Sequence, residues 1–527
     1  MKEHAGLKHQ LTAAYGLLPI KQPHPDELVL AISPESFWST LNSLRETCEI
    51  TFVDLFGVDL RSTHDIFQLH LIFSFDAEQT WLHFIVDVDE QTASFLSLAN
   101  LFPATGWYER VIWEELGLLP QNHPLLHRLR LAPDWPEQVY PAREGFAWKE
   151  PITACEPIHF ALEAAPTGVV DYPLGPVRSG IVESGHYTLR TVGEELIDIS
   201  VQPFYKHRGI EQRAVEVSLE LVPLLAERIS GTSAFAHSLA FCQAYERAAE
   251  LDVPPRARFL RTLLAELERL YNHLGFQADL CQATGLSVAQ AQFDLWKERV
   301  LRLNAAISGH RYLFGLNIPG GLRRDLTESG QEEIHTLISA LRKELPALSR
   351  QLLASSSHRD RLERTGILSP QQAREYCAVG PVGRASGRDR DLRRDHPYAA
   401  YAQMDFTVPL LQEGDALARA TIVLEESEQA LRIIEQALAQ LPAGAIAASC
   451  PAPAPGESAL GWAESARGEC LHWILMGENG KLRRYRVRSA SFANWQAFSL
   501  AIPGHNILTD FPVIEQSFAL SFAGANG

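Results

Sequence analysis

The segment that decides the fold reads Glu227-Arg228-Ile229-Ser230-Gly231-Thr232-Ser233-Ala234-Phe235-Ala236-His237. Ser230 and Ser233 are three residues apart and His237 follows four residues later, so the segment looks like a metal-binding helix entry from which the metal ligands have been removed. A thiolate at such positions can bridge soft metal ions, whereas a serine hydroxyl is neutral near pH 7 and binds them poorly. The segment therefore predicts the framework of a metal site without the metal chemistry.

The bulk composition is that of a globular protein. The chain has 527 residues, of which 46% are hydrophobic and 21% charged, so we expect two to four domains. A net charge of -17 argues against a nucleic-acid-binding surface and against adhesion to anionic lipid, and it favours a docked protein partner. We find no apolar run near the roughly 20 residues of a membrane span and no secretory signal after Met1, which predicts a location on the cytoplasmic side.

The cysteines are scattered singly, and no two of them stand at a Cys-x-x-Cys spacing. This pattern predicts reduced thiols, no disulfide framework and no iron–sulfur cluster held by this chain alone. An iron–sulfur centre would belong to a partner. The seven positions are Cys48, Cys155, Cys242, Cys281, Cys377, Cys450 and Cys470.

Residues 1–132 are expected to form a small α+β domain. A helix is predicted near residues 35–47, followed by strands at 50–60, 67–75 and 81–88, which are rich in aromatic and β-branched residues. The second run alternates with a period near two, which predicts a half-buried strand in a sheet covered on one face. Glu109 and Arg110 follow on an amphipathic turn, and their proximity alone predicts a solvated ion pair.

Residues 133–157 are rich in proline and lack periodicity, which predicts an extended linker between two domains. A hairpin or short meander and then a helix are expected from Leu174 to Glu211. Pro255 is expected to begin a long helix whose leucines form one buried stripe. Glu266, Arg269 and His273 share another face of that helix, either as a surface ion pair or as a proton path.

Three further features complete the predicted second domain, residues 158–527. Asp415 is expected to cap a helix that runs to about Leu441, and residues 471–476 and 484–487 to form a hairpin. The glycine-rich run 380–387 resembles a phosphate-binding loop only superficially, because no Lys-Ser/Thr pair accompanies it. We therefore reject nucleotide binding there.

The order of motifs along nearly the whole chain resembles the fused peripheral-arm subunits of respiratory complex I and the large subunit of energy-converting nickel–iron hydrogenases, including formate hydrogenlyase. Gly106–Gly117 with His123-Pro124 resembles the 30 kDa complex I subunit. The later motifs resemble the 49 kDa subunit and the hydrogenase large subunit: Gly175-Pro176, His207-Arg208-Gly209-Ile210-Glu211, Glu266–Leu274 and Gly320–Asp325. The resemblance implies an α+β fold, with a docking domain in residues 1–132 and a mainly helical domain of the hydrogenase type, with small peripheral sheets, in residues 158–527.

The resemblance also shows what the chain lacks. Hydrogenases carry cysteines at the positions of Ser230 and Ser233 and, in a second motif near the C-terminus, at those of Ser521 and Gly524. All four nickel–iron ligand positions therefore lack sulfur, and no nickel–iron centre is expected. Complex I has an Asp-Tyr pair where this chain has Ser230-Gly231, and a quinone-binding histidine in the loop where Arg178 stands, so its tyrosine proton donor is missing too.

Two functional hypotheses follow from the resemblance. In the first, a partner's 4Fe-4S cluster delivers electrons to a quinone or another acceptor in the former metal cavity, and ion translocation is driven in neighbouring membrane subunits. The residues expected to line or support that cavity are Arg178, His207, Arg208, Ser230, Gly231, Ser233, His237, Ser521 and Gly524. In the second, the subunit is a redox-inactive scaffold, and a true hydrogenase subunit is a third alternative.

The resemblance predicts the surroundings as well. The expected partners are a small iron–sulfur subunit and ion-translocating membrane subunits, with no nucleic acid, at the cytoplasmic face of the cell membrane. A cavity of quinone size would favour the first hypothesis. A cavity filled by Phe235, Phe241 and Phe522 would favour the scaffold.

Overall fold

The structure, a computed structural model, describes residues 11, 19–146, 151–156, 166–178 and 183–526. The chain start, part of the predicted linker and residues 179–182 lie outside the described residues. The chain forms two compact units, Met1–Ala164 with Glu375–Cys377 and Ala165–Arg374 with Ala378–Gly527. No helix in the described part is long and apolar enough to cross a membrane.

The first unit is built on a five-stranded sheet of order β1-β2-β5-β4-β3, in which only β2 and β5 run parallel. The three predicted strands and the predicted helix are present, whereas β1 and β2 were not predicted. Its elements are β1 (Pro19–His24), β2 (Glu27–Ala31), α2 (Phe37–Thr47), β3 (Thr51–Asp59), α3 (Arg61–His64), β4 (Ile66–Phe75), η1 (Asp76–Glu78), β5 (Thr80–Asp89), β6 (Ser94–Leu96), η2 (Pro103–Thr105), α4 (Gly106–Leu116) and β7 (Leu119–Gln121).

The sheet of this unit is buried more completely than its sequence indicated. Helix α4 lies directly on β3 at Gly57, where a Cβ would be 2.3 Å from Leu116 Cδ1. The alternate face of β4 is covered as well, since His70 is 4% exposed and stacks on Phe56 with 5.0 Å between ring centroids. The expectation of a half-buried strand is therefore wrong, because His70, Ile72 and Ser74 on the alternate face are buried as well.

Glu109 and Arg110 on α4 do not form the solvated ion pair that their sequence suggested. Glu109 is fully buried and accepts hydrogen bonds from Ser97 Oγ (2.5 Å) and Leu98 N (2.7 Å). Arg110 is 5% exposed and donates from Nε to the carbonyl oxygen of His127 (2.8 Å). The two side chains instead fix separate backbone segments of the first unit.

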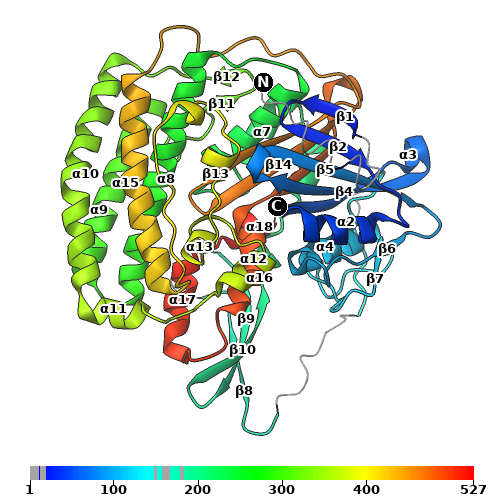
Figure 1. Ribbon diagram of the computed structural model, residues 1–527, viewed down its shortest axis with the longest axis horizontal. Coiled ribbons are helices and arrows are strands. Elements are labelled where there is room, and N and C mark those ends of the chain that lie inside the picture. Colours follow the sequence, from blue (N-terminus) through cyan, green and yellow to red (C-terminus); the bar gives the residue numbers. More distant parts are fainter. Residues whose placement is uncertain (1–10, 12–18, 147–150, 157–165, 179–182, 527) are drawn as a thin grey trace. The chain divides into compact units, whose positions relative to one another are not determined.

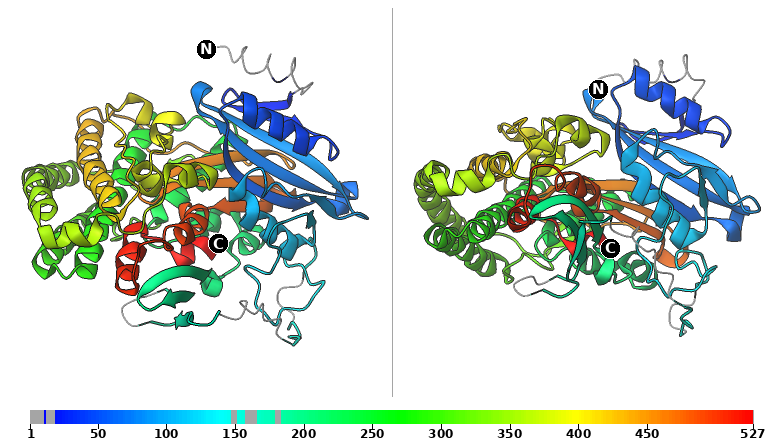
Figure 2. Two further views of the ribbon diagram at one scale, coloured as in Figure 1. Left: turned by 60° about the horizontal axis from the view of Figure 1, so that its bottom comes forward. Right: turned by 90° about the horizontal axis from the view of Figure 1, so that it is seen from below.

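The second unit combines long helices with small sheets, so the fold is mixed α and β as predicted (Figures 1 and 2). Its elements are β8 (Val170–Leu174), β9 (His186–Val192), β10 (Glu195–Gln202), η3 (Phe204–Lys206), α5 (Ile210–Glu216), η4 (Leu219–Leu221), α6 (Val222–Ala226), α7 (Ala234–Ala248), α8 (Pro255–Ala283), α9 (Ser287–Ser308), β11 (Asn317–Ile318), β12 (Gly321–Leu322), α10 (Glu328–Ala354), α11 (Ser356–Leu362), α12 (Pro370–Glu375), α13 (Gly380–Ala385), α14 (Leu392–Asp395), η5 (Tyr401–Gln403), α15 (Ala416–Ala439), β13 (Ser458–Ser465), β14 (Gly468–Met476), η6 (Glu478–Gly480), β15 (Leu482–Arg488), α16 (Ala490–Leu500), η7 (Leu508–Asp510), α17 (Phe511–Phe518) and α18 (Phe522–Asn526).

Helices α8, α9, α10 and α15 lie side by side as a bundle, which both figures show at one end of this unit. As predicted, α8 begins at Pro255, and the Asp415 side chain caps α15 by accepting a hydrogen bond from Ala418 N. The predicted hairpin is β14 and β15, to which β13 adds an unpredicted third strand. The glycine-rich run near residue 380, which was expected to be a loop, begins with the short helix α13.

The polar face of α8 lies in the core. Glu266, Arg269 and His273 are at most 2% exposed, so the surface ion-pair alternative is wrong. The face is covered because Arg393 of α14 and Glu426 of α15 form ion pairs with it, and because the backbone of β13 accepts a hydrogen bond from it. His273 Nε2, for example, lies 3.0 Å from Glu426, and Arg269 donates to the carbonyl oxygen of Glu464 (2.6 Å).

Candidate functional site

Two segments nearly three hundred residues apart meet at one place in the second unit. Ser230 and Ser233 immediately precede α7, and Ser521 and Gly524 lie at the start of α18. A Cβ built on Gly524 would lie 3.2 Å from the Cβ of Ser521 and 3.6 Å from that of Ser230. The three serines are 2% to 4% exposed. We call these four residues the serine pocket.

Arg208 and His207 join the two sides of the serine pocket. Arg208 precedes α5 and donates from Nη2 to the carbonyl oxygens of Ile229 (3.0 Å) and Ala523 (2.8 Å). His207 Nδ1 lies 2.7 Å from the carbonyl oxygen of Asn526 on α18. The His-Arg-Gly motif therefore holds the backbone of the pocket together.

A carboxylate on one side of the serine pocket was not anticipated from the sequence. Glu183 accepts hydrogen bonds from Ser521 Oγ, with both carboxylate oxygens at 3.1 Å, and from Ala523 N (2.9 Å). Ser521 Oγ in turn accepts from Gly524 N (2.9 Å). One acid thus fixes the start of α18 and the hydroxyl of the pocket.

A guanidinium lies on the other side. Arg467, in the turn between β13 and β14, donates to Thr232 Oγ1 (2.7 Å), Ser233 Oγ (3.3 Å) and the carbonyl oxygen of Ala519 (2.6 Å). Arg269 anchors the same turn by donating to the carbonyl oxygen of Ser465 (3.2 Å). The buried charge network of α8 therefore positions the cation of the pocket.

Glu268 is a second acid near this site that sequence reasoning missed. Its carboxylate accepts hydrogen bonds from Phe235 N (2.7 Å) and Ala236 N (3.0 Å) at the start of α7. Burial raises the pKa of Glu268 to about 8, although both backbone donors favour the ionised form. No motif distinguishes Glu183, Glu268 or Arg467, since each is a single charged residue whose partners come from distant elements.

The other residues expected at the cavity have different surroundings. Arg178 forms an ion pair with Glu515 (2.5 Å) and lies over the Tyr187 ring. Gly231 is exposed, and a Cβ there would meet no heavy atom within 4 Å. His237 is buried and its Nδ1 lies 3.0 Å from His472 Nε2 on β14; burial lowers the pKa of His237 to about 3, so the ring is neutral at physiological pH.

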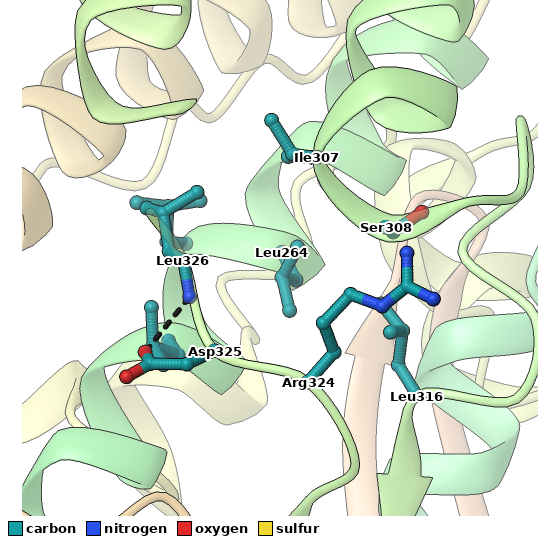
Figure 3. Close-up of a pocket in the computed structure, with 9 residues that line it drawn as sticks. Leu264, Ile307, Ser308, Leu316, Arg324, Asp325 and Leu326 are labelled. Atoms are coloured by element: carbon teal, nitrogen blue, oxygen red, sulfur yellow. Dashed lines mark hydrogen bonds between the residues drawn. The ribbon is translucent and has the colours of Figure 1, made fainter. Parts of the chain in front are cut away.

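Two cavities lie elsewhere in the second unit, and neither is lined by a residue of the serine pocket. The first, of about 20 Å³, lies among α8, α9 and the loop with Arg324 and Asp325, and it has room for roughly one water molecule (Figure 3). Figure 3 also shows the hydrogen bond from Leu326 N to Asp325 (2.8 Å). The second, of about 730 Å³, lies between the start of α9 and the end of α10.

Comparison with known proteins places this arrangement in a family. Residues 286–455 match the model of the respiratory-chain NADH dehydrogenase 49 kDa subunit, and residues 30–151 that of the 30 kDa subunit. Formate hydrogenlyase subunit 5 of Escherichia coli is 34% identical over 87% of this chain and 82% of its own length. The chain belongs to the family of fused complex I 30 kDa and 49 kDa subunits.

Other members of this complex I-like family agree. Hydrogenase-4 component G of Escherichia coli is 33% identical over 87% of this chain and 81% of its own length. The fused C/D polypeptide of the NADH-quinone oxidoreductase of Chromohalobacter salexigens is 26% identical over 91% of this chain and 90% of its own length. A chain from the membrane-bound sulfane sulfur reductase, an archaeal respiratory membrane complex, is 26% identical, with a TM-score of 0.65 over 69% of this chain and all of its own.

Family membership makes the chain a complex I-like peripheral-arm subunit of a respiratory or hydrogenase-related oxidoreductase complex. The residues of the serine pocket nevertheless do not fit a nickel–iron centre. Such a centre needs thiolates as soft bridging ligands, and the pocket offers hydroxyls that are already hydrogen-bonded to Glu183 and Arg467.

Proposed function

We propose that this chain is the acceptor-side subunit of a membrane-bound, ion-translocating oxidoreductase that does not activate hydrogen. Electrons come from a 4Fe-4S cluster in a small iron–sulfur partner subunit and pass to a quinone or a related acceptor beside the serine pocket. The complex works at the cytoplasmic face of the cell membrane, next to ion-translocating membrane subunits. The relatives named as NADH-quinone oxidoreductases and the respiratory membrane complex support this assignment.

The observation that carries the proposal is the polar, sulfur-free lining of the serine pocket. Reducing a quinone takes two electrons and two protons, so an acceptor site needs groups that donate hydrogen bonds and move protons. Ser521 Oγ is hydrogen-bonded to the Glu183 carboxylate at 3.1 Å, a distance suited to proton exchange. Gly231 leaves open space beside the pocket, where an acceptor could approach.

A redox-inactive coupling subunit is the second candidate, and the packing at the pocket favours it. Phe522 packs onto Gly185 so closely that a Cβ there would be 1.9 Å from the ring. Phe235 and Phe241 are fully buried. In this alternative, the hydrogen bonds of Arg208 and Arg467 serve only to hold α7, α18 and β14 together.

The test is to purify the native complex and to measure quinone reduction with low-potential electron donors, hydrogen production and metal content. We expect quinone reduction, no hydrogen production and nickel below about one tenth of an atom per chain. Glu183→Gln keeps the shape of the side chain and removes its charge, so it should lower the rate about 10²-fold or more if the acid moves a proton. The control is Glu195→Gln on the exposed start of β10, which should keep the wild-type rate.

Each outcome decides between the candidates. A complex that assembles but reduces no quinone, either as the wild type or with Glu183→Gln, supports the coupling subunit. Stoichiometric nickel together with hydrogen production would disprove both candidates and favour a true hydrogenase subunit.

A further inference from the structure

Three side chains able to bind a metal ion lie together between α7 and β14. They are His237, Cys470 and His472, and one ligand atom from each lies within 4.8 Å of the others. Their exposed fractions are 2%, 0% and 0%. This soft set is separate from the serine pocket, whose four positions carry no nitrogen or sulfur ligand.

The fold brings these residues together in a simple way. Cys470 and His472 are two residues apart on β14, the central strand of its sheet, so their side chains point to the same face. Helix α7 lies directly on this sheet, because a Cβ at Gly461 would be 2.1 Å from the carbonyl oxygen of Ala240. Gly461 pairs with His472 across the strands, which explains why His237, one turn before Ala240, reaches the histidine ring.

The hydrogen bonds around His472 suit a metal ligand. Its Nε2 lies 3.0 Å from Nδ1 of His237, and its Nδ1 lies 2.6 Å from the hydroxyl of Tyr485 on β15. With the proton on Nδ1 donated to the phenol oxygen, Nε2 of His472 accepts a hydrogen bond from Nδ1 of His237, and an ion between the two rings would replace this hydrogen bond once the His237 proton moves to Nε2 of its own ring. A neutral imidazole offers one lone pair to an ion.

We propose that His237, Cys470 and His472 bind one d10 metal ion, either zinc(II) or copper(I), which ties α7 to β14. One thiolate and two imidazoles are a ligand set used for both ions. Binding releases the thiol proton of Cys470 to solvent and forms one metal–sulfur and two metal–nitrogen bonds, with no change of oxidation state. Copper(I) gives a neutral complex, whereas zinc(II) leaves one positive charge on the site.

This site is independent of the proposed function, because the ion would hold two structural elements together and take no part in electron transfer. The scattered cysteines had predicted only that no iron–sulfur cluster is held by this chain alone. That expectation rested on spacings between cysteines, and a Cys-x-His pair on a strand escapes such a search.

The experiment is elemental analysis of the native complex, purified without chelators, together with X-ray absorption spectroscopy at the edge of the metal found. We expect about one zinc or copper per chain, with one sulfur near 2.3 Å and two nitrogens near 2.0 Å. Cys470→Ser should lower the metal content at least tenfold. Cys281→Ser replaces another fully buried cysteine, on α8, and should leave the metal content unchanged.

The element found distinguishes zinc from copper, and either result supports the site. A wild-type complex with less than about one tenth of either ion per chain, even after incubation with zinc(II) and with copper(I), would overturn it. A metal whose coordination shell contains no sulfur would also overturn the proposed site. Because this measurement is made on the wild-type complex, it remains decisive even if Cys470→Ser does not fold. Nickel in the complex would instead contradict the proposed function, so the two failures are distinguishable.

Discussion

Arg384 should be among the most sensitive positions of the second unit. Its side chain is fully buried and donates from Nε to Glu426 (2.8 Å) and from Nη1 to Glu464 (3.0 Å). Burial alone would raise the pKa of Glu426, but Arg384, followed by His273, more than offsets this effect and holds that pKa at about 2. Replacing Arg384 by methionine therefore leaves two buried carboxylates without their main counter-charge.

The expected cost can be obtained in two ways. A glutamate pKa lowered from 4.5 to about 2 corresponds to roughly 3 kcal/mol. Removing one partner of a buried ion pair costs about 3–5 kcal/mol. We expect Arg384→Met to lower the free energy of unfolding by about 3–5 kcal/mol at pH 7.

The pH dependence follows from the sign of the shift. Because the folded pKa of Glu426 lies below the unfolded value, its ion pairing stabilises the wild type fully above pH 4.5, and this stability is lost as the pH falls through about 2. The variant lacks this contribution. The difference between wild type and variant should therefore shrink as the pH falls below 4.5.

The assay is urea unfolding of the full chain at pH 7 and near pH 4, followed by tryptophan fluorescence. Arg302→Met is the matched control, because Arg302 pairs with Glu298 at the surface and should cost less than about 1 kcal/mol. Adding Glu426→Leu to Arg384→Met should recover part of the loss, since it removes one unpaired charge. If Arg384→Met costs no more than the control, or costs the same at both pH values, the reasoning is wrong.

Three more predictions test other parts of the molecule. Cysteine at all four positions of the serine pocket should create a cadmium site, because a Cβ at position 524 would lie 3.2 Å from that of residue 521 and 3.6 Å from that of residue 230. A folded variant whose cadmium content, by elemental analysis, equals that of wild type would contradict the claim that these positions meet. Gly185→Ala should lower the free energy of unfolding of the second unit, measured in urea, by about 1–3 kcal/mol, because the added Cβ would collide with Phe522. Gly231→Ala, where the added Cβ meets no atom, should change that free energy by less than about 0.5 kcal/mol. Equal effects of the two substitutions would refute this packing. Burial raises the pKa of Glu109 to about 7, so the stability that its protonated form contributes is full below pH 4.5 and is lost as the pH rises through 7. Glu109→Gln should therefore make the midpoint of urea unfolding less dependent on pH between pH 5 and pH 8. A pH dependence equal to that of the wild type would count against this assignment.

The sequence was a good guide where the signal is local. Leucine spacing and the position of Pro255 predicted α8, and an aspartate before an apolar run predicted the cap of α15. The polar face of α8 was harder to predict, because periodicity says which residues share a face and not what covers it. The sequence left Glu266 as part of either a surface ion pair or a proton path, whereas in the structure Arg393 and Tyr401 from distant parts of the sequence contact it in the core.

The candidate site also has parts that local sequence patterns predict and parts that depend on contacts between distant residues. The serine pocket could be located from motifs at both ends of the second domain. Glu183 and Arg467, which satisfy its hydroxyls, have no local signature, and Arg178 pairs with Glu515 on α17. His237 and His472 are 235 residues apart, so only the fold shows that they touch.

The hydrogen bond between Glu183 and Ser521 joins residues that are 338 positions apart. At roughly 5–20 residues per second, a ribosome needs about 20 to 70 seconds to add the second after the first. During that interval the nascent chain carries a carboxylate and a serine loop whose later neighbours do not yet exist. The hydrogen bond can therefore form only after α8, α9, α10 and α15 of the second unit have been synthesised.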